Sequence, residues 1–187
     1  MTAQIGAITG DERLDLSEKA VLIFCADNGI VAEGVSQAGQ EVTLAVAKSM
    51  AKNASSVGRM ARFAGADTIP VDIGINSDLT IDGVLDKKIA HGTRDFLIEP
   101  AMSEEETLGA IETGIALVAE CKDKGYRILA TGEMGIGNTT TSAAVAASLA
   151  VPKPPPSRRL DWRTRSRGGR PDGLRDGAEA LALLAVR

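Results

Sequence analysis

The feature that most constrains the fold is segment 128–144, where a short apolar run leads through three glycines into a hydroxyl-rich stretch. Residues 128–130 have the pattern of a buried strand, which we expect to end at Gly132. An Ala- and Val-rich segment with helical character begins near Thr140. A strand, a glycine-rich turn and a helix start in this order favour an anion site. Glycines let the backbone approach a ligand, and the N–H groups of a helix start attract negative charge.

Candidate site residues of this segment are one carboxylate, one amide, three glycines and two threonines: Glu133, Asn138, Gly132, Gly135, Gly137, Thr139 and Thr140. The threonines can cap the helix or donate to a phosphate. The glycines and threonines alone would fit a capped strand–turn–helix junction with no ligand. Glu133 favours a ligand site, and because its carboxylate would repel a simple anion, the ligand must also carry a group that binds a carboxylate. The pattern therefore predicts a ligand with both a phosphate and a cationic or N–H-bearing ring. It matches neither a Walker loop nor the dinucleotide fingerprint.

A second apolar run, residues 20–26, predicts a strand buried on both faces that ends at the turn Asp27, Asn28 and Gly29. Polar groups at the carboxyl end of a parallel strand lie where open α/β sheets bind ligands. Asp27 is therefore either functional or only a turn former, and the local pattern favours neither. The glycine-rich loop that follows holds three more polar candidates, with solvent-facing loop residues as the alternative: Glu33, Ser36 and Gln40.

Strands and helices alternate along the rest of the first 150 residues. We expect further strands at 68–75 and at 87–98, the latter interrupted at Gly92, and a helix at 42–64 broken near 53–58. Asp72 inside the first of these strands should be hydrogen-bonded or near the sheet's end, because an unpaired buried carboxylate is costly. The alternation predicts an α/β fold, with three α/β/α layers and a mostly parallel Rossmann-like sheet.

The clearest helix is 103–122, where Ser103 and Glu106 have the spacing of a capping box. We expect its apolar face to comprise Leu108, Ile111, Ile115, Leu117 and Val118. Residues 1–19 have the pattern of an irregular lead-in. We expect the lone His91 to be packed or exposed rather than catalytic, and Arg94 to form a surface ion pair rather than an anion site.

Composition excludes several classes of protein. The chain is 44% hydrophobic but only 3% aromatic, so its core must be aliphatic. Two cysteines without metal-ligand spacing and one histidine predict no metal site and no disulfide framework. No apolar stretch reaches the ~20 residues of a membrane span, and no signal peptide is visible. We therefore expect a soluble, cytoplasmic protein without membrane association.

The composition changes at Val151. Residues 151–187 contain five of the seven prolines and carry nine Lys and Arg against four Asp and Glu, which leaves a net charge of −9 on the rest. Three interpretations compete for this tail: a basic linker with a partner helix, an RNA-binding arm, or a frame-shifted translation. We favour the last, and predict a partial α/β domain at 1–150 followed by a poorly ordered, basic Pro- and Arg-rich tail. The acidic body argues against nucleic-acid binding.

Several of these segments together resemble the nicotinate-nucleotide–dimethylbenzimidazole phosphoribosyltransferase family. Residues 132–140, GEMGIGNTT, are similar to the family's signature loop. Further similar segments occur in the family's order: ADNG (26–29), EGVS (33–36), QEVT (40–43), VDIG (71–74), GTR (92–94) and PAM (100–102). The resemblance covers residues 1–150. Many members have His in place of Asn28 and Asn in place of Asp95. Members are also much longer, so the resemblance implies a central, truncated fragment that lacks the family's C-terminal general base.

The resemblance implies the chemistry. In this family a benzimidazole nitrogen displaces nicotinate from nicotinate mononucleotide, which gives α-ribazole phosphate for cobalamin assembly. It places Glu133 near the ribose and the azole, residues 135–140 along the nucleotide, and Asp27, Ser36 and Gln40 toward the benzimidazole. It also implies homodimers and no cofactor. Because the general base would be missing, we expect impaired activity. A non-catalytic nucleotide- or azole-binding module, or an inactive fragment, is the alternative.

Overall fold

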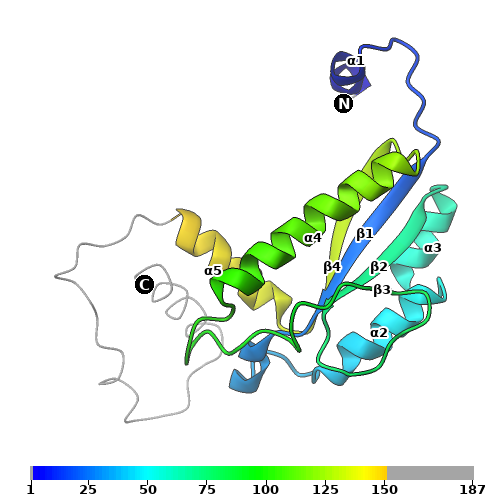
Figure 1. Cartoon of the computed structure of the whole chain (residues 1–187). Helices are drawn as coiled ribbons and strands as arrows, with labels where there is room; N and C mark the ends of the chain where they lie inside the picture. Colours follow the sequence, from blue (N-terminus) through cyan, green and yellow to red (C-terminus); the bar gives the residue numbers. More distant parts are fainter. Residues whose placement is uncertain (1, 151–187) are drawn as a thin grey trace.

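Four parallel strands form the sheet that positions the other elements, in the order β3-β2-β1-β4 (Figure 1). The strands are β1 (Lys19–Ala26), β2 (Asp67–Gly74), β3 (Leu85–Asp86) and β4 (Ile128–Met134). β1 pairs with β2 on one side and with β4 on the other, so the chain crosses over β1 between β2 and β4. This computed structural model describes residues 2–150, and the prediction of a separate tail at 151–187 lies outside them.

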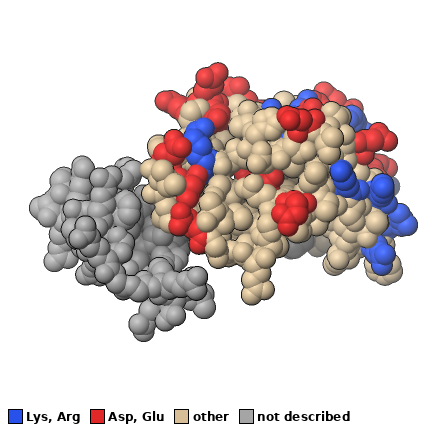
Figure 2. All heavy atoms as spheres, turned by 90° about the horizontal axis from the view of Figure 1, so that it is seen from below, with Lys and Arg blue, Asp and Glu red and all other residues tan. Residues whose placement is uncertain are grey.

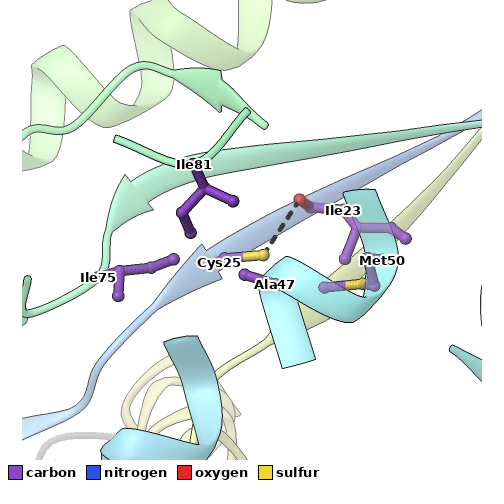
Figure 3. Close-up of a cluster of buried hydrophobic side chains, with 6 residues drawn as sticks. All are labelled: Ile23, Cys25, Ala47, Met50, Ile75 and Ile81. Atoms are coloured by element: carbon purple, nitrogen blue, oxygen red, sulfur yellow. Dashed lines mark hydrogen bonds between the residues drawn. The ribbon is translucent and has the colours of Figure 1, made fainter. Parts of the chain in front are cut away.

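Helices cover both faces of the sheet. The helical elements are α1 (Thr2–Thr9), the 3-10 helix η1 (Gly29–Glu33), α2 (Glu41–Ala51), α3 (Ser56–Phe63), α4 (Glu104–Asp123) and α5 (Asn138–Ala150). On one face, Ala47 and Met50 of α2 pack with Ile23 and Cys25 of β1 (Figure 3). On the other face, α4 packs through Leu117 and Cys121 against β1 and β2. The predicted α/β architecture, with a parallel sheet between two helical layers, is confirmed.

Local sequence signals placed several elements correctly. The predicted helix break appears between α2 and α3, where Asn53 has a positive φ of 51° and Ser55 caps α3 by accepting from Gly58 N–H. The capping box of α4 is formed by Ser103 and Glu106, as expected. Asp72 is hydrogen-bonded, as predicted: its Oδ1 accepts from two backbone N–H groups, and its Oδ2 accepts from Lys88 Nζ at 2.7 Å.

Three predictions about elements were wrong. The lead-in contains the helix α1, which has no buried residue and therefore left no apolar pattern. Segment 87–98 contains no strand, because after Ile89 it leaves the sheet to cross over Asp27, whose carbonyl accepts from Thr93 N–H. β4 runs to Met134, past Gly132, and is an edge strand among the described residues. Ala130, predicted to lie in a buried strand, is therefore exposed.

The apolar face predicted for α4 is also largely wrong. Of the five residues, only Leu117 is buried. The other four have about half or more of their surface exposed: Leu108, Ile111, Ile115 and Val118. The side of α4 that meets the sheet is instead formed by Leu117 and Cys121. Among residues 2–150, no helix is both long and apolar enough to cross a bilayer.

Candidate active site

The loops after β1 and β4 meet at the carboxyl edge of the sheet, where the strand order reverses between β1 and β4. Asn28 joins them: its Nδ2 donates to the carbonyl of Ile136 at 3.1 Å, and its Oδ1 accepts from Thr141 Oγ1 at 2.9 Å. Thr43 of α2, fully buried, accepts from Ile136 N–H at 3.1 Å. The glycine-rich loop is thus held by the turn after β1 and by α2, at the point where doubly wound sheets bind ligands.

Close backbone contact explains two of the predicted glycines. A side chain at Gly135 would collide with the backbone oxygen of Ala26, so β1 and the loop can touch only because no Cβ is present. Gly137 has a φ of 87°, a conformation that other residues adopt only with strain, and a Cβ there would lie 2.8 Å from Val31. These two glycines therefore fix the path of the loop into α5.

Glu133 lies on the exposed edge of the sheet, near the end of β4 rather than in the loop. Its Oε2 accepts a hydrogen bond from Asn138 Nδ2, and Asn138 Oδ1 accepts from Thr139 Oγ1 at 3.3 Å. Three residues predicted from sequence thus form one exposed polar row at the start of α5. A carboxylate, an amide and a hydroxyl side by side can accept from and donate to a polar ligand.

The backbone at the start of α5 is partly engaged within the protein. The N–H groups of Thr140 and Thr141 both donate to the carbonyl of Gly137, at 3.1 and 3.2 Å, and Asn138 N–H donates to Gly135. Fewer N–H groups than a bare helix start would offer are therefore free for an anion. The side-chain groups of Asn138 and Thr139 remain on the exposed side.

Asp27 is almost completely buried, with 1% of its surface exposed, and connects three loops. Its N–H donates to Gly74, its carbonyl accepts from Thr93 N–H, and its Oδ2 accepts from Asn76 N–H at 2.8 Å. Its Oδ1 is buried without a hydrogen-bond partner in the described part of the chain. Asp27 therefore holds the three loops together, and its Oδ1 can still accept a hydrogen bond.

The loop of residues 29–41 lies next to these groups. A side chain at Gly29 would collide with the backbone of Arg94 and Asp95, so η1 starts in contact with that segment. Gln40 Nε2 donates to the carbonyl of Asn28 at 3.2 Å, whereas Ser36 Oγ accepts from Ala38 N–H within its own loop. Glu33, at the end of η1, has a raised pKa because its carboxyl group shares a hydrogen bond with Asp95.

The structure thus brings together most of the predicted residues in two groups. Asp27, Asn28, Gly29 and Gln40 form the first, which connects through Ile136 to the second, Gly135 to Thr140 with Glu133. Sequence reasoning missed Thr43 and Asn76, which hold the loop after β4 and the carboxylate of Asp27. Thr43 lies in the segment QEVT, but only the folded chain reveals its partner.

His91 and Arg94, which the sequence analysis did not count as site residues, both lie near acidic side chains. His91 is exposed, with Nε2 3.6 Å from Asp78 Oδ1. Arg94 forms the expected ion pair: both of its terminal nitrogens contact the carboxylate of Glu106, the shorter contact being 2.6 Å. No group of three His, Cys, Asp or Glu side chains suited to a metal ion occurs within residues 2–150.

Comparison with known proteins gives consistent matches. A family model described as Phosphoribosyltransferase matches residues 1–156. The nicotinate-nucleotide–dimethylbenzimidazole phosphoribosyltransferase of Clostridium acetobutylicum is 44% identical over 146 residues, which are 78% of this chain and 42% of the relative. The protein of the same name from Acetivibrio thermocellus is 39% identical over 184 residues, 98% of this chain and 50% of the relative.

A solved structure agrees. The crystal structure of nicotinate-nucleotide–dimethylbenzimidazole phosphoribosyltransferase from Thermus thermophilus aligns with a TM-score of 0.82 and 32% identity, covering 98% of this chain and 53% of that one. The chain spans about half the length of the relatives it matches, or less. Both the sequence match and the shared fold place this chain in the nicotinate-nucleotide–dimethylbenzimidazole phosphoribosyltransferase family.

Proposed function

We propose that this chain contributes to phosphoribosyl transfer from nicotinate mononucleotide to dimethylbenzimidazole, which yields α-ribazole phosphate and nicotinate. The observation that carries the proposal is the polar row of Glu133, Asn138 and Thr139 beside the loops joined by Asn28. The names of the relatives supply the substrates.

The reaction forms a bond from a benzimidazole nitrogen to the anomeric carbon of the ribose. The bond from that carbon to nicotinate breaks, nicotinate keeps the electron pair, and the proton of the azole N–H must reach a base. Positive charge develops on the ribose as nicotinate leaves, so a nearby carboxylate stabilises the transition state. We assign that role to Glu133, with Asn138 holding its carboxylate and Thr139 and Thr140 directed to the nucleotide.

The second group of residues is assigned to the azole. Asp27, Ser36 and Gln40, with Asn28, Gly29 and Glu33 around them, would border the slot for the flat ring. The unpartnered Oδ1 of Asp27 supports this, because a buried acceptor without a donor is unusual. Gly132, Gly135 and Gly137 would let the backbone approach the nucleotide. The proposed setting is the cytoplasm, and the proposed assembly is a homodimer.

The test is a turnover assay with the 187-residue chain, nicotinate mononucleotide and dimethylbenzimidazole, scored by α-ribazole phosphate. Loss of a positioned acid–base or charge-stabilising group costs ~10²–10⁴-fold in rate. Glu133→Gln should therefore lower kcat by that order, whereas Glu112→Gln, an exposed carboxylate on α4, should leave it unchanged. Equal rates for the chain and for Glu133→Gln would contradict the assignment.

A non-catalytic nucleotide- or azole-binding module is the second candidate, because the polar row and the unpartnered Oδ1 of Asp27 could hold a ligand without turnover. Calorimetric titration with nicotinate mononucleotide separates the two: binding without turnover supports the module. Nucleic acid is not among the proposed partners. Acidic side chains are spread over the face shown in Figure 2, whereas most basic ones lie near one end.

A further inference from the structure

Two of the segments noted in the sequence, GTR (92–94) and PAM (100–102), have no role in the proposed function. Both lie between β3 and α4, in the stretch that leaves the sheet and passes the end of β1 (Figure 1). Gly92 makes this passage possible: its φ is 78°, and a Cβ there would lie 3.2 Å from the carbonyl oxygen of Asp27. The backbone of this stretch can therefore lie directly against the turn that follows β1.

Thr93 holds the backbone on both sides of Asn28. The N–H of Thr93 donates to the carbonyl of Asp27 at 3.0 Å, and the N–H of Gly29 donates to Thr93 Oγ1 at 3.1 Å. The Asp27 carbonyl and the Gly29 N–H belong to the two peptide groups that flank Asn28. One half-buried threonine therefore fixes the position and direction of the Asn28 side chain.

The next residue, Arg94, fixes the same stretch from the other side. Its N–H donates to the carbonyl of Ala101 at 2.9 Å, and its Nε donates to the carbonyl of Pro100 at 3.0 Å. Its two terminal nitrogens donate to the carboxylate of Glu106, which belongs to the capping box of α4. Thr93 therefore contacts the turn after β1 from a segment that is itself anchored to the start of α4.

Asn28 passes this position on to the candidate active site. Its side-chain amide contacts the carbonyl of Ile136 at 3.1 Å and Thr141 Oγ1 at 2.9 Å, and its own carbonyl accepts from Gln40 Nε2 at 3.2 Å. Ile136 and Thr141 bracket most of the loop assigned to the nucleotide, and Gln40 is assigned to the azole. A shift of the Asn28 backbone would therefore disturb both groups of site residues.

We propose that Thr93 is a positioning residue for phosphoribosyl transfer, which acts through Asn28 to hold the loop of residues 135–140 in place for nicotinate mononucleotide. The inference rests on the proposed function for its substrate. Within residues 2–150, no hydrogen bond joins Thr93 to Glu133, Asn138 or Thr139, so its effect must pass through Asn28. Because catalysis depends on how precisely reacting groups are placed, a small displacement of this loop is expected to matter.

The first experiment compares three variants of the full 187-residue chain by calorimetric titration with nicotinate mononucleotide. Thr93→Val keeps the shape of the side chain and the backbone N–H but removes the oxygen that accepts from Gly29. It should raise the dissociation constant about fivefold, the effect of one neutral hydrogen bond. Thr93→Ser restores the oxygen and should stay within about twofold of the native chain.

Thr113→Val is the matched control, because Thr113 is also half-buried and its Oγ1 donates to the carbonyl of Gly109 within α4, at 2.8 Å. It should leave nucleotide binding unchanged. Urea unfolding of all three variants reports whether the fold is intact. Equal losses of affinity in Thr93→Val and Thr113→Val, or no rescue by Thr93→Ser, would overturn the positioning role.

The second experiment tests whether Thr93 acts through Asn28. Asn28→Ala removes the side chain that Thr93 positions, so adding Thr93→Val to it should change nucleotide affinity little further. Residues that act in series give such non-additive effects, whereas independent residues give additive ones. If the loss of affinity in the double variant equals the combined losses of the two single variants, Thr93 does not act through Asn28 and the inference is wrong.

A third experiment needs no substrate and separates this inference from the proposed function. The N–H groups of Ile136, Asn138, Thr140 and Thr141 are all hydrogen-bonded. Their hydrogen exchange should become at least about fivefold faster in Thr93→Val but not in Thr113→Val. Unchanged exchange would overturn the positioning role, even if the transferase assignment stands. Faster exchange in a chain that does not bind nicotinate mononucleotide would support the positioning of the loop and overturn its substrate.

Discussion

The side-chain amide of Asn28, which follows β1, donates to the carbonyl of Ile136, which follows β4, although 108 positions separate them in sequence. Thr141 Oγ1 donates to the other end of the same amide. One side chain therefore holds the glycine-rich loop and the first turn of α5 against the end of β1. Ile136 and Thr141 are both half-buried, so water cannot replace the Asn28 amide as their hydrogen-bond partner without a cost in stability.

Replacing Asn28 by Ala should loosen this junction. The substitution removes both hydrogen bonds and leaves the carbonyl of Ile136 without its donor, so we expect a loss of ~1–3 kcal/mol in the free energy of unfolding. Urea denaturation measures it, with Gln37→Ala, an exposed position in the following loop, as the control. An unfolding midpoint equal to that of the control would show that water replaces the amide.

Gly135→Ala adds only one methyl group, but we expect it to destabilise the fold. The added methyl would meet the backbone oxygen of Ala26, and neither of two adjoining strand ends can move aside cheaply. Overpacking of this kind costs ~1–3 kcal/mol and occasionally more. Gly114→Ala is the matched comparison, because its methyl meets nothing within 4 Å and removes a helix glycine, so it should stabilise by up to ~1 kcal/mol. Thermal unfolding of both variants would show opposite shifts, and shifts of the same sign would contradict this explanation.

The elements that sequence predicted correctly are those fixed by residues close together in the chain. The capping box of Ser103 and Glu106 spans three residues, and the break before α3 depends on Asn53 and Ser55. The strands β1 and β2 were recognisable because each is a short apolar run between turn residues. Local sterics and local hydrogen bonds decide such features, and both can be read from sequence.

The features that sequence did not predict depend on which elements meet in space. The apolar residues of α4 lie on two sides of the helix, and only packing decides that Leu117 faces the sheet while Ile115 does not. β4 begins with an apolar run typical of a buried strand, but among residues 2–150 it pairs with β1 alone. The bond from Thr43 to the backbone of Ile136 spans 93 positions, so no local pattern indicates it.

Replacing only one member of the ion pair Lys88–Asp72 should destabilise the fold more than replacing both. Lys88 Nζ contacts Asp72 Oδ2 at 2.7 Å, and the side chains are only 18% and 8% exposed. Removing one partner of such a buried pair costs ~3–5 kcal/mol, whereas replacing both can be neutral. Lys88→Met should therefore be strongly destabilising, and Asp72→Asn with Lys88→Met together much less so.

The comparison for this pair is Lys87→Met. Lys87 lies 3.7 Å from Glu120, and both side chains are more than 40% exposed, so its loss should cost only ~0–1 kcal/mol. Urea unfolding of the native chain, Asp72→Asn, Lys88→Met and the double variant measures the coupling between Lys88 and Asp72. Additive effects of the two substitutions would mean that Asp72 is satisfied by its backbone donors alone.

The contact between Arg94 and Glu106 predicts a dependence of stability on pH. Hydrogen bonds from Arg94, and then from the backbone of Ser103, lower the pKa of Glu106 from 4.5 to about 2. A carboxyl group with a depressed pKa in the folded state contributes stability above its unfolded pKa, and this contribution is lost as the pH falls through the folded pKa. The contribution of Glu106 should therefore be complete above pH 4.5 and decline toward about pH 2.

Comparing the chain with Glu106→Gln tests this. Gln keeps the shape of the capping box but cannot be ionised, so the difference in urea midpoint between the two proteins should shrink as the pH is lowered through that window. Glu105→Gln, at an exposed neighbouring position in the same first turn, is the control. A difference that stays constant with pH would show that the charge of Glu106 contributes nothing to folding.

The thiol of Cys25 should be unreactive in the folded protein. Cys25 is fully buried in the core shown in Figure 3, and burial, aided by the charge of Asp72, raises its pKa to about 12. At pH 8 only about one thiol in 10⁴ would be ionised, and the thiolate is the reactive form. Native protein should therefore react slowly with a thiol reagent such as DTNB, while protein unfolded in urea should react at both Cys25 and the buried Cys121. Gln37→Cys supplies an exposed thiol as the positive control, and a native chain that reacts as fast as this variant would mean that the sheet opens readily around β1.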